Sequence, residues 1–334
     1  MINAALVSPS SEADWRRMFP HYVPEWGGVR FSFSPTAALY DILFVYDGLP
    51  DALIYPDAPY RVFVASEPQA IKTYRQQFLA QFDLVLTTDV NTRHRNFRIT
   101  QVGPPWHVGI RDNQGQMRPQ GMGWLELETF RPVKTKQVSV VSSNKAYAEG
   151  HRERLQFVER IKAHFGPAVD VFGRGINGFA DKLDVLSEYR YHIAIENSTF
   201  DHYWTEKLSD PLLTLTYPLY HGSGNILEYF PPEALTPIDI RDPENAIGAI
   251  RRIIESDTAE RAVPHMEEAR RRILNEHNLM AILSEIAREV VTHRCTSRVV
   301  KPRLLPEKVF KPRGEKFRSS VRKRLRTIAD LMRR

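Results

Sequence analysis

The sequence predicts an α/β protein of two domains, each made of alternating strands and helices. Its 334 residues exceed the ordinary size of a single domain, and a hydrophobic content of 42% is enough for two cores. Short apolar runs of strand length alternate with amphipathic helical segments along both halves, which is the pattern of α/β domains. We expect four parts: an N-terminal domain at 1–130, a linker at 131–137, a C-terminal domain at 138–299 and a tail at 300–334.

In the N-terminal half, four short apolar runs predict buried strands, at 2–7, 41–45, 61–65 and 83–87. Residues 69–82, between the last two runs, have the pattern of a helix. The next stretch, 103–121, is rich in Gly and Pro and predicts loops, because these residues interrupt regular structure. Residues 125–137 then cross to the second half of the chain.

The C-terminal half repeats the alternation of strands and helices. An amphipathic helix is expected at 151–165, because Leu155, Val158 and Ile161 fall on one face. The other expected elements are strands at 138–141, 169–172, 191–195 and 217–220, a helix at 205–215, a helix at 243–255 and further helices between 259 and 294.

The polar loop after the strand at 191–195 is the strongest candidate for a binding site. Thr205 is a plausible N-cap for the helix that follows this loop. A loop that leads from a buried strand into a helix N-terminus is where α/β folds bind phosphorylated ligands. Pro211 lies inside the same helix and removes one backbone N–H, so we expect a kink or an irregular first turn.

This segment carries three linked motifs: EN-x(5)-Y-x-T-E-K-L at 196–208, then YPLYHG, then YFPPEAL. The combination resembles the C-terminal signature of the α1,3-fucosyltransferases, glycosyltransferase family 10, with the layout of its bacterial members. The resemblance covers about residues 138–240 and only short patches before them. It implies a GT-B-like fold, in which two Rossmann-like α/β domains face a central cleft.

The resemblance also implies a donor-binding set. Lys207 lies in the first turn of its helix, where the helix dipole favours an anion, and Tyr203 has a phenolic donor nearby. Arg154 is implied to bind a diphosphate, while Asn197 and Glu206 are implied to position the nucleotide sugar. Without the motif, Glu206, Lys207 and Arg154 would be read as solvated residues on charged helices. There is no Asp-x-Asp motif, so we expect no required cofactor and a divalent metal in an accessory role at most.

Glu67 is the candidate general base. An acceptor hydroxyl attacks a sugar carbon poorly unless a base removes its proton, and a carboxylate in a cleft suits that role. Glu67 follows the apolar strand at 61–65, and the family has a similar strand followed by a glutamate. The alternative is a carboxylate at the end of a strand that points into water.

The positive charge of the chain is concentrated in its tail. Residues 301–334 contain 13 lysine and arginine residues and 3 acidic ones, whereas the whole chain carries a net charge of +6, so the remainder is net acidic. At 315–334, apolar residues recur every three or four positions between basic ones, which predicts an amphipathic helix suited to an anionic membrane surface. A solvated charged tail, or one packed on the body, is the alternative.

The same features predict where the protein works. There is no apolar run of membrane-spanning length, no recognisable signal peptide and a single cysteine, Cys295. We expect a cytoplasmic enzyme, peripheral on the inner face of the cell membrane.

The leading interpretation is an inverting fucosyltransferase. It would move L-fucose from GDP-fucose to an N-acetylglucosamine or glucose unit of a cell-surface polysaccharide or lipopolysaccharide, with α1,3-linkage. An enzyme of the same fold that uses another nucleotide sugar is the nearest rival. A non-catalytic anion- or nucleic-acid-binding protein is the rival from a different class. The tail lacks interleaved aromatic platforms and the body lacks a DNA-reading motif, so we expect no nucleic-acid partner.

Overall fold

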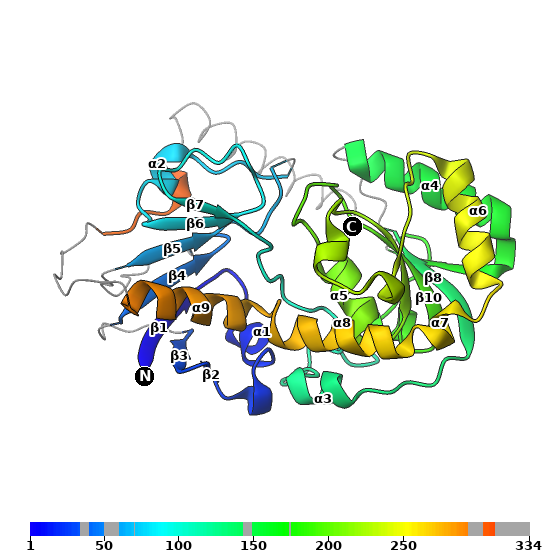
Figure 1. The fold of residues 1–334 in the computed structure, drawn as a ribbon, viewed down its shortest axis with the longest axis horizontal. Helices are drawn as coiled ribbons and strands as arrows, with labels where there is room; N and C mark the ends of the chain where they lie inside the picture. Colours follow the sequence, from blue (N-terminus) through cyan, green and yellow to red (C-terminus); the bar gives the residue numbers. More distant parts are fainter. Residues whose placement is uncertain are drawn as a thin grey trace, which may run out of the picture.

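A computed structural model describes residues 1–33, 40–49, 60–69, 71–142, 149–173, 175–292 and 303–310. The N-terminal part is built on a seven-stranded sheet of order β2-β3-β1-β4-β5-β6-β7, in which only β2 runs antiparallel to its neighbour (Figure 1). The four predicted strands are present as β1, β4, β5 and β6. The strands are β1 (Ile2–Val7), β2 (Glu25–Trp26), β3 (Val29–Ser32), β4 (Ile42–Tyr46), β5 (Arg61–Val64), β6 (Leu84–Thr87) and β7 (Phe97–Ile99).

Three short helices accompany this sheet: α1 (Glu12–Arg16), α2 (Gln76–Leu79) and α3 (Trp124–Thr129). The prediction of one helix over 69–82 was wrong, because the described part of that segment is helical only in α2. Before α2, Lys72 and Tyr74 bind Asp47 in the loop after β4, with the Tyr74 hydroxyl 2.6 Å from the carboxylate of Asp47. These bonds hold the segment across the strand ends as a loop.

The C-terminal part is built on a five-stranded parallel sheet of order β12-β11-β10-β8-β9. Its central strand, β10, is almost wholly buried, as expected for a parallel strand covered on both faces. The strands are β8 (Lys136–Val141), β9 (Val169–Phe172), β10 (Tyr189–Ile195), β11 (Tyr217–His221) and β12 (Thr236–Pro237). The helices are α4 (Glu149–Phe165), α5 (Glu206–Leu213), α6 (Pro243–Ile254), α7 (Thr258–Arg261) and α8 (Val263–Asn275).

The last long helix, α9 (Leu279–Thr292), returns to the first half of the molecule and packs on β1, β2 and β3. In Figure 1, α8 and α9 run one after the other beneath both sheets. Asn278, at the junction between them, donates a hydrogen bond of 2.7 Å to the carbonyl of Met18. The range 138–299, expected to form the C-terminal domain, therefore ends in a helix that covers the N-terminal sheet.

The start of the expected tail is also packed on the N-terminal part. Leu304 is buried among apolar residues on the α2 face of the sheet. The backbone N–H of Leu305 donates to the side-chain oxygen of Gln81 at 2.8 Å, and Glu307 accepts from the N–H of Arg75 at 2.9 Å. Residues 303–310 thus form part of the body, and the predicted amphipathic segment 315–334 lies outside the described residues.

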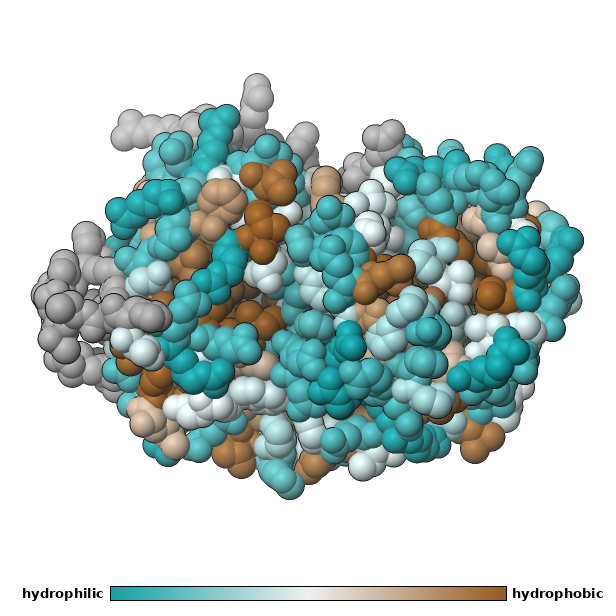
Figure 2. Space-filling view, in the orientation of Figure 1, coloured by the Kyte–Doolittle hydropathy of each residue, from teal (hydrophilic) through white to brown (hydrophobic). Residues whose placement is uncertain are grey.

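The face shown in Figure 2 is mainly hydrophilic where the two halves meet, and its hydrophobic residues form small separate groups. Within the described part of the chain, no helix is both long and apolar enough to cross a membrane. The buried apolar side chains form one large cluster that spans both sheets and a smaller one on the α2 face of the N-terminal sheet.

Candidate donor and base sites

Glu196, the residue immediately after β10, organises the start of α5. Its carboxylate is buried and accepts hydrogen bonds from the backbone N–H of Thr205 at 2.7 Å and from the Thr205 hydroxyl at 2.8 Å. Burial raises the pKa of Glu196, although the charge of Lys207, 3.5 Å away, opposes that effect. Sequence reasoning assigned Glu196 only to the motif, whereas the structure makes it the anchor that fixes the first turn of α5.

The first turn of α5 presents Lys207 and Glu206 beside this anchor. Thr205 is the N-cap, as predicted, and its hydroxyl accepts from the backbone N–H of Lys207 at 3.3 Å. The Lys207 ammonium lies 3.1 Å from a Glu206 carboxylate oxygen. Burial disfavours its charge, but Glu206 and Glu196 outweigh that effect and hold the pKa of Lys207 above its ordinary value. Lys207 is therefore a fixed cation at a helix N-terminus.

Pro211 does not distort this turn. The N–H groups of Leu208 and Ser209 both bind the carbonyl of Thr205, at 3.0 and 3.1 Å, so the helix begins regularly. Pro211 lies in the later part of α5, and the helix continues to Leu213. The expected alternatives of a kink or an irregular first turn are not found at Lys207.

Arg154 and Asn197 meet at one end of the C-terminal sheet. Helix α4 places the Arg154 guanidinium 2.6 Å from the side-chain oxygen of Asn197, to which it donates a hydrogen bond. Both residues adjoin Glu196: Asn197 follows it in sequence, and the charge of Glu196 partly offsets the lowering of the Arg154 pKa by burial. A hollow of about 270 Å³ opens here, lined by Gly150, Glu153, Asn197, Phe200, His221 and Arg241 among others.

Tyr203 lies two residues before Thr205, the N-cap of α5. Its side chain is buried, and burial together with the charge of Glu196 raises the pKa of its phenol, so it remains a neutral donor at physiological pH. The predicted donor residues Arg154, Asn197, Tyr203, Glu206 and Lys207 are thus gathered around the carboxyl end of β10.

Glu67 belongs to the other half of the molecule. It follows β5 and lines a hollow of about 360 Å³. Although the residue is exposed, partial desolvation raises the pKa of its carboxyl, and the negative charge of Asp47 adds to the shift. Lys72 and Lys207 lower the pKa of Glu67, and Glu206 raises it. The charges at the start of α5 therefore act on the pKa of the Glu67 carboxyl.

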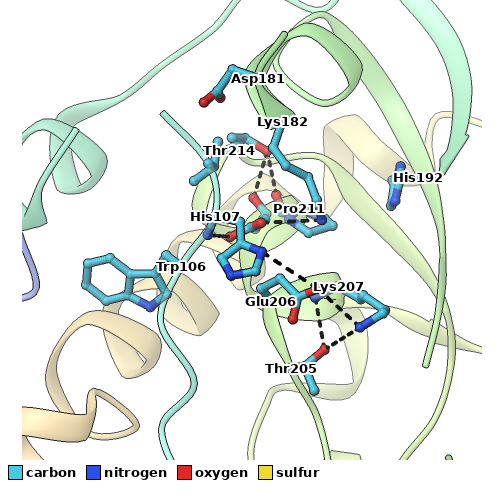
Figure 3. A network of polar contacts seen from close by, with 12 residues as sticks. Trp106, His107, Asp181, Lys182, His192, Thr205, Glu206, Lys207, Pro211 and Thr214 are labelled. Carbon is cyan, nitrogen blue, oxygen red and sulfur yellow. Dashed lines mark hydrogen bonds and ion pairs between the residues drawn. The ribbon is translucent and has the colours of Figure 1, made fainter. Parts of the chain in front are cut away.

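The loop that carries His107 joins the two halves at the same place (Figure 3). The His107 backbone N–H donates to the buried carboxylate of Asp210 at 3.0 Å, and Lys182 forms an ion pair with Asp210 at 3.4 Å. The half-exposed ring of His107 places its Nδ1 4.0 Å from a carboxylate oxygen of Glu206. Sequence reasoning missed these residues, because a histidine in an irregular loop has no periodic signal.

Arg17 and Asp181 hold this loop in place from opposite halves. The buried Arg17 guanidinium donates to the carbonyls of Trp106 and Val108, at 2.8 and 2.5 Å. Asp181 accepts from the backbone N–H of Gly109 at 2.7 Å. The backbone on both sides of His107 is therefore fixed by buried charged hydrogen bonds.

Among the residues that the structure describes, no group of three or more His, Cys, Asp or Glu side chains could hold a metal ion. The charges around the start of α5 are instead lysine, arginine and two carboxylates. This arrangement can neutralise an anion with fixed cations and a helix N-terminus. The fold and these residues together define an α/β protein in which cationic side chains and two carboxylates gather at the carboxyl end of β10.

Comparison with known proteins identifies this class more closely. Residues 131–259 match the model of the family described as glycosyltransferase family 10 (fucosyltransferase), C-terminal part. A curated protein from Bos taurus, 3-galactosyl-N-acetylglucosaminide 4-alpha-L-fucosyltransferase FUT3, is 32% identical over 137 residues, which is 37% of this chain and 36% of that protein. A putative fucosyltransferase-like protein from Arabidopsis thaliana is 30% identical over 113 residues, 32% of this chain and 22% of that protein. The chain thus spans about a third or less of these two relatives.

Solved structures extend the likeness to the whole fold. A crystal structure of an α1,3-fucosyltransferase with GDP-fucose superposes with a TM-score of 0.51 at 16% identity, covering 89% of this chain and 92% of that one. A second crystal structure of an α1,3-fucosyltransferase superposes with a TM-score of 0.53 at 16% identity, covering 90% of this chain and 92% of that one. The predicted GT-B-like fold is confirmed.

Residues 131–259 resemble the C-terminal part of glycosyltransferase family 10. The resemblance predicted from the motifs is therefore confirmed. The family match begins at residue 131, after the N-terminal half, so Glu67 lies outside the matched residues.

Proposed function

We propose that this protein is an inverting fucosyltransferase that moves L-fucose from GDP-fucose to a hydroxyl of an N-acetylglucosamine or glucose unit, with α1,3-linkage. One observation carries the proposal: the Lys207 ammonium lies 3.5 Å from the buried carboxylate of Glu196, and Arg154 donates at 2.6 Å to Asn197, the next residue. In this proposal Glu67, which follows β5 of the other sheet, faces that cationic site as the base. The family match and the fucosyltransferase activity of the Bos taurus relative support fucosyl transfer.

In this proposal, the C-terminal domain binds the donor. Lys207 and Arg154 hold the diphosphate with positive charge, and the neutral phenol of Tyr203 donates a hydrogen bond to it. Asn197 orients Arg154 through their 2.6 Å hydrogen bond and helps to position the nucleotide sugar. Glu206, held beside Lys207, accepts a hydrogen bond from a sugar hydroxyl.

The reaction is a single displacement. The acceptor oxygen bonds to the anomeric carbon as the bond from that carbon to the diphosphate oxygen breaks, and Glu67 receives the acceptor proton. GDP leaves with the bonding electrons, and the cations stabilise its developing charge. The raised pKa of Glu67 suits this role, because a base works best when its pKa approaches the working pH. A divalent metal has at most an accessory role.

The cellular setting is part of the proposal. We infer a bacterial-type enzyme that acts in the cytoplasm on a polysaccharide or lipopolysaccharide precursor, with residues 315–334 resting on the inner face of the membrane. The basic amphipathic pattern of that segment supports this placement. The same site with another nucleotide sugar is the second candidate, because the cations that hold a diphosphate do not distinguish the attached sugar.

A donor panel tests the proposal. The protein is incubated with GDP-fucose, GDP-mannose or UDP-sugars, together with a panel of neutral oligosaccharides, and the products are identified by mass spectrometry. We expect GDP release and a deoxyhexose mass increase from GDP-fucose only. Transfer from a different nucleotide sugar would favour the second candidate, and no transfer from any donor would refute the enzyme assignment.

A further inference from the structure

A third hollow connects the Glu67 site to the donor site. It has a volume of about 380 Å³ and lies between the loop after β6 and the loop after β10. It shares lining residues with the hollow that contains Glu67, namely Gln69, Asp89 and Asn91. On its other side it shares Thr199 and Phe200 with the hollow beside Asn197. The three hollows therefore adjoin one another through shared lining residues.

We propose that this connecting hollow is the acceptor site, that it takes a neutral glycan, and that Phe200 is the platform on which a sugar ring packs. The inference rests on the proposed function, because the acceptor must lie between the base and the anomeric carbon of the donor. The connecting hollow adjoins the hollow that Glu67 lines and the hollow beside Asn197. In this proposal, the reacting end of a glycan bound there lies close to Glu67 and to the donor sugar.

Phe200 is presented by a turn that is held rigidly. The N–H of Tyr203 bonds to the Phe200 carbonyl at 3.2 Å, and His202 within the turn has a φ of 64°, a conformation that non-glycine residues adopt at a cost. The His202 ring compensates through hydrogen bonds to the Tyr229 hydroxyl at 2.6 Å and to Asn225 at 3.1 Å. The platform is thus ordered before any ligand arrives, which lowers the entropic cost of binding.

The lining of this hollow matches the chemistry of an uncharged sugar. Phe200 is 42% exposed and Val90 is 69% exposed, so two apolar surfaces remain available for the C–H face of a pyranose. Asp89 and Asp201 lie in the same lining and accept hydrogen bonds from hydroxyl groups. Among the described residues, those that line it include no lysine or arginine. Such a site favours a neutral polyol and disfavours an anionic one.

The test compares Phe200→Ala with wild type in two readouts, the KM of a neutral disaccharide acceptor, N-acetyllactosamine, and the KM of GDP-fucose. We expect the acceptor KM to rise by about tenfold, the size of a lost aromatic contact, with the donor KM and the GDP affinity nearly unchanged. Phe200→Trp should restore the acceptor KM, because it keeps an aromatic face. Val133→Ala, at a site 78% exposed on the linker, is the matched control.

The outcomes separate the inference from the proposed function. An unchanged acceptor KM in Phe200→Ala, or a rise in the donor KM instead, would overturn the inference. Turnover of GDP-fucose by wild type would still support the proposed function in that case. If wild type turns over no GDP-fucose, acceptor binding is read directly by calorimetry with GDP present. Wild-type binding of N-acetyllactosamine that weakens in Phe200→Ala supports the site, and an absence of binding refutes it.

Charge gives an independent arm of the same experiment. An acidic acceptor, sialylated N-acetyllactosamine, should bind wild type more weakly than the neutral disaccharide, because it would meet Asp89 and Asp201. The double variant Asp89→Asn/Asp201→Asn should narrow that difference at low salt, where charge repulsion is least screened. Equal binding of the two acceptors by wild type would refute the preference for a neutral ligand.

Discussion

Lys207 has two roles in this account, and a pair of variants separates them. In the folded protein its ammonium lies 3.1 Å from Glu206 and 3.5 Å from Glu196, and its side chain is 23% exposed. Lys207→Met removes the counter-charge from both carboxylates. Breaking a buried ion pair costs about 3–5 kcal/mol, and we expect the lower end of that range because Lys207 keeps some exposure to water.

The double variant Lys207→Met/Glu206→Gln should recover most of that loss. It leaves no charge at Glu206, and Glu196 readily takes up a proton because burial already raises its pKa. GDP binding should not recover, since a hydrogen bond to a charged group contributes about 1.5–3 kcal/mol, or about 10- to 150-fold in Kd. Val133→Ala, at an exposed position outside the site, is the control and should bind GDP as wild type does.

The assay is denaturant unfolding with and without GDP. At a GDP concentration of about 100 times the wild-type Kd, GDP should stabilise the wild type by about 2.7 kcal/mol. A hundredfold weaker Kd reduces that stabilisation to about 0.4 kcal/mol. If the double variant is stable and GDP still stabilises it as much as wild type, Lys207 is only an internal counter-charge and the diphosphate site is elsewhere.

Two further predictions concern pH and the tail. Because the pKa of the Glu67 carboxyl is raised, the acid limb of kcat/KM should lie at a pH above the ordinary glutamate value of about 4.3. Activity is present above the pKa of Glu67 and is lost as the pH falls through it. Asp47→Asn removes one cause of the raised pKa, so it should move the acid limb to lower pH. An unmoved limb would contradict the assignment of Glu67 as the base. Deleting residues 311–334 should release the protein from anionic vesicles in a sedimentation assay and leave transfer to a soluble acceptor intact, whereas equal vesicle binding by both forms would refute the membrane role. The deletion begins at 311 because Leu304 is part of the core.

Local signals were sufficient to predict the strand, the cap and the helix that surround Lys207. Strand β10, the cap at Thr205 and helix α5 are consecutive in the sequence, and their apolar periodicity and cap chemistry are strong. Arg154 was implied by the family pattern, and the structure joins it to Asn197. These elements are determined mainly by nearby residues, so sequence reasoning reached them.

The remaining features depend on contacts between distant residues. Strands β2 and β7, of two and three residues, are too short to show a period and form because neighbouring strands offer free edges. The return of α9 to the N-terminal sheet depends on partners some 260 residues earlier, as the Asn278 to Met18 bond illustrates. His107 is placed by Asp210, about 100 residues later, and an irregular loop gives no sign of that partner.

The claim that Glu67 acts as the base across the domain boundary is central to the mechanism. Its most direct test is the turnover of Glu67→Gln with GDP-fucose and a neutral acceptor, both saturating, with the GDP affinity of the variant measured in parallel. Glutamine keeps the shape of the side chain but cannot take the acceptor proton, so turnover should fall by about 10²- to 10⁴-fold while GDP affinity stays at the wild-type value. Turnover close to wild type in a variant that binds GDP normally would contradict the account and assign the base to another residue.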